Sequence, residues 1–266
     1  MKISNEHIPV RQLVTLSLIF LVLGNLSSEA REKGLSPNID SIRGSGANAA
    51  QSTVEHLKQR ATEGDVVSQF TLGFMYANGQ DVPKSGAEAA KWYEMAAIKG
   101  DARSQANLGY MYANGQGISA NHAKAFKWSQ LGALAGNALA QSNLGSLYDK
   151  GHGVAQDFVA AVKWFRLAAL QGEVLGQYNL GAMYDTGRGV SKDDFEAAKW
   201  YRLAAMQGYA LAQSNLGIMY ATGRGVRQND KEAIRWLRMA ASQGHERARK
   251  NLMIMHRAGR AGPEAF

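Results

Sequence analysis

The chain has 266 residues, 45% of them hydrophobic, and a formal net charge of +8. It contains no cysteine, which excludes a disulfide framework, a thiolate metal site, a cysteine nucleophile and lipid attachment at a cysteine. The stability of the fold must therefore come from packing.

Residues 1–30 are laid out like a secretory signal peptide. Lys2 and Arg11 precede an apolar stretch over 13–24, and small residues ending at Ala30 follow it. The apolar stretch is shorter than the about 20 residues of a membrane-spanning helix. We therefore expect cleavage after Ala30 and a periplasmic or secreted protein that is not an integral membrane protein. An uncleaved membrane anchor is the alternative, because the segment before the apolar stretch is long and only weakly basic.

A flexible leader is expected next. Residues 31–46 are polar and rich in glycine and serine, a composition typical of linkers. Residues 47–64 follow, and their second part resembles one half of the repeat described below. We expect them to form an N-terminal capping helix.

The tryptophans reveal an internal repeat. All five are spaced by 36 residues, and each lies in a segment such as "KWFRLAA" (163–169) or "KWYRLAA" (199–205). A fixed period of this length is typical of stacked units, each of which buries its apolar face only against its neighbours. We therefore expect one elongated array of five units, called copies 1 to 5, over residues 65–100, 101–136, 137–172, 173–208 and 209–244.

Each copy is expected to contain two helices. In copy 5 the first helix carries Leu216, Met219 and Tyr220 on one face. A glycine in its middle, Gly217, would cost about 1 kcal/mol relative to alanine. Because every copy repeats this glycine, we expect a small residue of the second helix, here Ala240, to approach it closely.

Glycines and caps mark the helix ends. The first helix of each copy should end at a glycine, and the connector then contains a second glycine in most copies, as in "GRGV" (187–190). We interpret these glycines as turn geometry, since a phosphate-binding loop would need a preceding strand and a third glycine. The residues expected to cap the second helices are Ser85, Asn121, Asp157, Asp193 and Asn229.

The tryptophans lie on the second helices, and an aromatic residue repeated at this spacing is typical of a core. We therefore expect each to act as an apolar wedge between helices rather than as part of a cofactor site. The tryptophans are Trp92, Trp128, Trp164, Trp200 and Trp236.

The combined pattern, "AQxNLGxMYxxGxGVxxDxxxAxKWYRxAAxQG", resembles the Sel-one-like repeat (SLR), a relative of the tetratricopeptide repeat, over residues 65–244. This resemblance implies an all-α fold, a right-handed α-solenoid of antiparallel helix pairs. Three departures are local: Asp81 replaces the second connector glycine of copy 1, Ser129 replaces an aromatic residue in copy 2, and Ala135 replaces a polar residue before Gly136. Residues 245–266 resemble a lone first helix with a tail, in which Met253 replaces the middle glycine, and should form the C-terminal cap.

The sequence offers little chemistry for catalysis. Its six histidines share no metal-ligand spacing, and metalloprotease and serine-hydrolase motifs are absent. Some SLR relatives have been discussed as β-lactamase-like, but the SxxK pattern is absent here. Asp193 and Asp194 form an acidic pair, yet Asp193 is expected to be a cap. We therefore expect no enzyme, no cofactor and no metal.

Basic residues recur on the second helices. One hypothesis is a basic ridge that attracts anionic polymers or membrane surfaces. The other, which we favour, is a solvated outer face whose long side chains cover the tryptophans. Export argues against a nucleic-acid partner. The residues concerned are Lys91, Lys127, Lys163, Lys199 and Arg235, with Arg166, Arg202 and Arg238.

The resemblance implies a scaffold that binds a protein or peptide partner in the bacterial envelope or outside the cell. A binder or modulator of cell-wall enzymes or polysaccharide is the alternative, and an enzyme is a third hypothesis. In two-helix solenoids the first helices line the concave surface, so partner-binding residues should occupy the positions there that the repeat leaves free, and the connector tips. Phe74, Tyr110 and Tyr178 lead these candidates, although Phe70 and Phe74 could instead pack against the N-terminal capping helix. The full candidate set is Phe70, Phe74, Tyr110, Asp149, Tyr178, Asp185, Arg188, Ile218 and Arg224.

Overall fold

The computed structural model describes residues 52–261. The expected signal peptide, the leader and residues 47–51 of the expected cap lie outside this range. The described residues belong to one compact unit and form twelve helices and no strand. The predicted all-α fold of helix pairs is confirmed.

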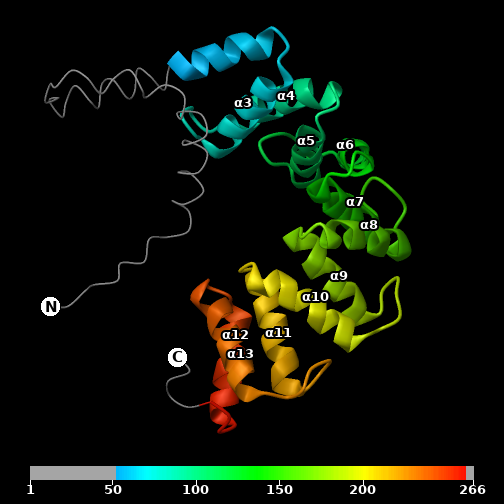
Figure 1. Ribbon diagram of the computed structural model, residues 1–266, viewed down its shortest axis with the longest axis vertical. Coiled ribbons are helices and arrows are strands. Elements are labelled where there is room, and N and C mark those ends of the chain that lie inside the picture. The colour runs from blue at the N-terminus through cyan, green and yellow to red at the C-terminus, as the bar shows by residue number, and fades with distance from the viewer. Residues whose placement is uncertain (1–51, 262–266) are drawn as a thin grey trace, which may run out of the picture. The chain divides into compact units, whose positions relative to one another are not determined.

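The helices follow one another as pairs (Figure 1). A helix over 52–62 comes before copy 1, and α13 (Glu246–Arg257) follows copy 5. The first helix of each copy packs on its own second helix and, from copy 2 onward, also on the second helix of the copy before. The first helices are α3 (Val66–Asn78), α5 (Ala102–Asn114), α7 (Ala138–Lys150), α9 (Val174–Thr186) and α11 (Ala210–Thr222). The second helices are α4 (Gly86–Ile98), α6 (His122–Leu134), α8 (Phe158–Leu170), α10 (Asp194–Met206) and α12 (Asp230–Ser242).

The predicted caps of the helices are present. Ser85 and its four counterparts each accept a hydrogen bond from a backbone N–H in the first turn of the second helix. The glycine after each first helix has a φ between 65° and 73°. This is the left-handed conformation, which is strained for a residue with a side chain.

The prediction that Ala240 and its counterparts approach the middle glycine was wrong. A β-carbon added to Gly73 would lie 2.5 Å from the ring of Tyr93, and one added to Gly217 would lie 2.8 Å from Leu237. The glycine therefore makes room for the residue that follows the tryptophan. The small residue of the second helix instead faces the next first helix, since a β-carbon added to Gly132 would lie 2.8 Å from that of Ala140.

The core contains the tryptophans and their neighbours. Four tryptophans are buried, with exposures of 5–7%, whereas Trp164 is half-buried. The residues after Trp164 and Trp200 are buried more deeply, with Phe165 and Tyr201 each at 2%. The cationic groups of Lys91, Lys127, Lys199 and Arg235 lie 5.4–5.6 Å from the ring centres of the adjacent tryptophans. These contacts agree with side chains that cover the tryptophans.

A buried glutamine joins the first helix of each copy to the helix that precedes it. The Nε2 atom of Gln213 donates a hydrogen bond of 3.1 Å to the carbonyl oxygen of Ala205, at the end of the preceding second helix. Gln69, Gln105, Gln141 and Gln177 make the same contact over 2.8–3.4 Å. In copy 5 the Oε1 atom of Gln213 also accepts a hydrogen bond of 2.9 Å from Gln243.

The connectors make a second joint between copies. The second connector glycine of each of copies 2 to 5 lies so close to the start of the preceding second helix that a β-carbon on it would overlap the backbone there. Gly153 meets the carbonyl of His122, for example, and Gly189 meets that of Phe158. In copy 1 the position is held by Asp81, which has a φ of 57°. The glycine is therefore required by close approach between copies.

Candidate protein-binding surface

The first helices lie on the side where successive copies come closest together. The first helices of neighbouring copies contact one another from α3 to α9, more closely than neighbouring second helices do. Residues on the outward face of the first helices thus form one continuous surface, called here the first-helix surface. All predicted site residues except the connector arginines belong to these helices.

Two aromatic side chains are exposed on this surface in copies 1 and 2. Phe74 is 43% exposed and Tyr110 is 42% exposed. A hollow of about 350 Å³ lies between them, and Lys84 and Asn107 also line it. A second hollow, of about 250 Å³, lies on the other side of Tyr110 and is lined by residues of α7 such as Ser142. Tyr110 therefore separates two adjacent hollows, an arrangement that suits an aromatic anchor for a bound chain.

Phe70 is placed differently. Its ring centre lies 5.9 Å from that of Tyr93, and the guanidinium carbon of Arg103 lies 4.0 Å from its ring centre. The helix over 52–62 packs with Leu72 and Met75 instead. Phe70 thus packs within copies 1 and 2 rather than against the described part of the N-terminal cap, and Phe74 stays exposed.

Tyr178 and Ile218 are half-buried. The ring centre of Tyr178 lies 5.7 Å from that of Tyr201 and 5.0 Å from that of Tyr209. Burial raises the pKa of the Tyr178 hydroxyl above its ordinary value. Ile218 packs against the core formed by α12 and α13. Both side chains therefore contribute to packing, and less of their surface is available to a partner than at Tyr110.

The predicted acidic and basic site residues pair with each other. Asp149 forms an ion pair of 2.9 Å with Arg188, and Asp185 forms one with Arg224. Arg224 also lies 3.3 Å from Asp194. Each arginine comes from the connector of the next copy, so these four side chains join neighbouring copies through ion pairs.

Two further residues line the larger hollow, although the sequence pattern does not mark them as binding residues. Asn107 belongs to the repeated "NLG" motif, which indicates a framework residue, yet it lines the larger hollow beside Tyr110. Lys84 lies in the connector of copy 1, directly before the cap residue Ser85. The repeat gives no signal for either, because residues of different copies meet only when the copies are stacked.

Two further properties concern the described range alone. Within residues 52–261, no helix is both long enough and apolar enough to cross a membrane. In the same range no three histidine or acidic side chains are grouped so that they could hold a metal ion.

The Sel1 repeat profile matches the chain five times, over residues 66–101, 102–137, 138–173, 174–209 and 210–245. The chain belongs to the Sel1-repeat family. Each match begins one residue after the corresponding copy expected from the sequence. Sel1-repeat proteins are generally protein–protein interaction scaffolds and typically non-catalytic.

Solved Sel1-repeat structures are similar to this chain. A protein of uropathogenic Escherichia coli, described as a protective antigen with an SLR fold, is 32% identical with a TM-score of 0.69, over 86% of this chain and 53% of that one. This chain therefore spans about half the length of the Escherichia coli protein. A Sel1 repeat protein from Oxalobacter formigenes is 30% identical with a TM-score of 0.71, over 85% and 92% of the two chains. No curated protein matches the chain.

Proposed function

We propose that this Sel1-repeat chain is a non-catalytic scaffold that binds a protein or peptide partner on the first-helix surface of copies 1 to 3. The observation that carries the proposal is the exposure of Phe74 and Tyr110 beside two hollows. Exposed aromatic side chains next to hollows commonly dominate binding energy at interfaces. Family membership supports the same function class.

The partner should insert apolar side chains beside Tyr110. The larger hollow is lined by the aromatic ring of Tyr93, the side-chain amide of Asn107 and the ammonium group of Lys84. An extended peptide with an apolar side chain would fit, because the amide can hydrogen-bond its backbone.

The test is affinity capture with the full chain, followed by mass spectrometry, using the unmodified protein and the double variant Phe74→Ser and Tyr110→Ser. The variant should lose the stoichiometric partner and keep its melting curve, because both side chains are about two-fifths exposed. Lys163→Ala, on the exposed face of α8, is the matched control and should keep the partner. Loss of the partner with the lysine variant alone would place binding on the second helices and overturn the proposal.

We also propose that the protein is exported and acts in the periplasm or outside the cell. The layout of residues 1–30 supports this. N-terminal sequencing of the protein from the exported fraction should begin near Arg31. An intact Met1 in the membrane fraction would instead identify the segment as an anchor.

A further inference from the structure

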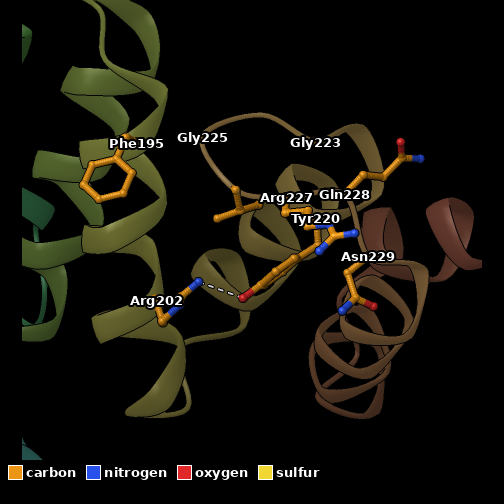
Figure 2. A pocket seen from close by; sticks show the side chains of 9 residues that line it. Phe195, Arg202, Tyr220, Gly223, Gly225, Arg227, Gln228 and Asn229 are labelled. Carbon is orange, nitrogen blue, oxygen red and sulfur yellow. Dashed lines mark hydrogen bonds between the residues drawn. The ribbon is translucent and has the colours of Figure 1, made fainter.

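A separate hollow lies away from the first-helix surface. It has a volume of about 900 Å³ and lies between α10 and the connector of copy 5. Figure 2 shows Phe195 and Arg202 on α10, with Tyr220, Arg227, Gln228 and Asn229 across from them. Its size is in the range of pockets that hold small ligands or a few residues of a peptide.

Part of this hollow belongs to the repeat. Arg202 donates a hydrogen bond of 2.7 Å to the hydroxyl of Tyr220. Arg166 donates one of 2.5 Å to the hydroxyl of Tyr184 at the same place one copy earlier. This arginine–tyrosine contact is thus a framework feature and does not distinguish the hollow.

Two other lining residues are particular to this junction. Phe195 corresponds to alanine, valine or lysine in the other copies, and Arg227 corresponds to proline, serine or alanine. Phe195 and Arg227 lie in different copies, yet both line the same hollow. Departures from the repeat therefore converge on one place. The corresponding residues are Ala87, Ala123, Val159 and Lys231 for Phe195, and Pro83, Ser119, Ala155 and Ser191 for Arg227.

Neither Phe195 nor Arg227 has a role in packing that would account for its side chain. Phe195 is 68% exposed. Arg227 is exposed and makes no hydrogen bond or ion pair with any residue in the described range. By contrast Arg224, in the same connector, pairs with Asp185 and Asp194. The hollow thus offers an apolar ring and an unpaired guanidinium group to solvent.

The lining has a positive charge. It contains the guanidinium groups of Arg202 and Arg227, and no aspartate or glutamate. The acidic residue that precedes Phe195 in the chain, Asp194, is already within 3.3 Å of Arg224. An anionic group is therefore the complement, and guanidinium groups bind carboxylates with directed hydrogen bonds.

We propose that this hollow is a second binding site, which takes an acidic peptide segment. A carboxylate of the peptide lies against Arg227 and Arg202, and an apolar side chain beside it lies against the ring of Phe195. The amides of Gln228 and Asn229 are placed to hydrogen-bond the peptide backbone. This site is independent of the proposed first-helix surface, so either can fail without the other.

The test uses the full chain and a fluorescein-labelled peptide, Gly-Phe-Asp-Asp-Gly, with blocked ends, followed by fluorescence anisotropy. Control peptides carry Asn-Asn in place of Asp-Asp, or Gly in place of Phe. The acidic aromatic peptide should bind roughly tenfold or more tightly than either control. Equal binding of all three peptides, or no binding of any, would overturn the proposal.

The repeat itself supplies the variants. Phe195→Val and Arg227→Ser each introduce the residue that another copy carries, so the fold should be unaffected, and each should weaken binding by roughly tenfold. Conversely, Val159→Phe with Ser191→Arg should build the site one copy earlier, where Arg166 and Tyr184 already supply the framework contact, and raise the stoichiometry to two peptides per chain. Unchanged binding by Phe195→Val and Arg227→Ser contradicts the site. Phe74→Ser with Tyr110→Ser should leave this binding unchanged, which separates it from the proposed scaffold function.

Discussion

Copies 1 and 2 use the same helices as copies 3 to 5 but lack one hydrogen bond between the two helices of each copy. In copies 3, 4 and 5, the buried glutamine of the first helix accepts a hydrogen bond of 2.8–2.9 Å from a glutamine at the end of the second helix. In copies 1 and 2 that donor is replaced by Lys99 and Ala135. The Oε1 atoms of Gln69 and Gln105 are accordingly buried without a hydrogen-bond partner among residues 52–261.

The connectors differ in the same direction. Arg188, Arg224 and Arg260 each reach back to an acidic residue of the preceding copy, whereas the corresponding residues of copies 2 and 3 are Gln116 and His152. The exposed Phe74 and Tyr110 lie in copies 1 and 2. The side chains that vary between copies therefore differ in their contacts. In copies 3 to 5 they join neighbouring copies, whereas in copies 1 and 2 they include the exposed rings of Phe74 and Tyr110.

The largest expected effect on stability comes from removing a buried aromatic side chain in copies 3 to 5. Tyr201→Ala removes a ring that is 2% exposed and packs over Gly181, and should lower the free energy of unfolding by about 3–5 kcal/mol. Trp164→Ala should cost less, because Trp164 is half-buried. Denaturant melts measure both losses. A greater loss for Trp164→Ala would mean that the tryptophans, and not their neighbours, carry the core.

The next effect tests the glutamine contacts directly. Gln207→Ala leaves the Oε1 atom of Gln177 without its donor and should destabilise the protein by about 1–3 kcal/mol, the usual cost of an unsatisfied buried polar atom.

The reverse change should strengthen the weaker part. Ala135→Gln supplies the missing donor to Gln105 and should stabilise the protein by about 0.5–1 kcal/mol. Thermal or denaturant melts measure the gain. No gain would mean that the Oε1 atom of Gln105 has another source of hydrogen bonds and that the two parts differ less than the contacts indicate.

A smaller effect is expected at the connectors. Arg224→Ala removes contacts with Asp185 and Asp194, but its side chain is 40% exposed. Screening by solvent limits the loss to about 0.5–1 kcal/mol, and the loss should shrink as salt is added. Arg227→Ala in the same connector is the control and should leave stability unchanged.

Lowering the pH should destabilise copy 2 before it destabilises copy 3. Burial alone would raise the pKa of the Asp101 carboxyl, but hydrogen bonds from Arg103 and Ser104 outweigh it and hold that pKa below its ordinary value. Asp101 therefore stabilises the folded state above the pKa that the carboxyl has in the unfolded chain, and this contribution is lost as pH falls from about 4 through the folded-state pKa. The corresponding cap in copy 3, Asn137, does not titrate. Hydrogen exchange at pH 3 should show earlier opening of α5 than of α7, and Asp101→Asn should remove the difference.

The sequence predicted those features that are local and repeated. Helix pairs, left-handed glycines and caps such as Asp193 depend on a few neighbouring residues, and five copies of the signal reinforce one another. The partner of Gly73 was missed because helix periodicity does not give the rotation of one helix against the next. The tie through Gln213 was missed because it depends on how copies stack.

The candidate site was predictable only where a side chain acts alone. Phe74 and Tyr110 were chosen as free positions, and both are exposed. The position of each residue in its own copy does not show that Asp149 pairs with Arg188 or Asp185 with Arg224, although opposite charges recur at a separation of 39 residues. That recurrence, one repeat plus three residues, was the signal for contacts between copies.

The connector glycines bear on how such an array could lengthen during evolution. Copies 2 to 4 each contribute a glycine that fits against the preceding copy, and a second helix whose start receives the glycine of the following copy. A duplicated copy of this kind would carry both the connector glycine and the helix start that the next glycine contacts. It would therefore fit between its neighbours without further substitutions at this contact. Copy 1 carries Asp81 instead, and its β-carbon would overlap the backbone of a preceding copy at an interior position. Duplication of copies 2 to 4 is therefore compatible with the joint, whereas copy 1 is restricted to the N-terminal end of the array.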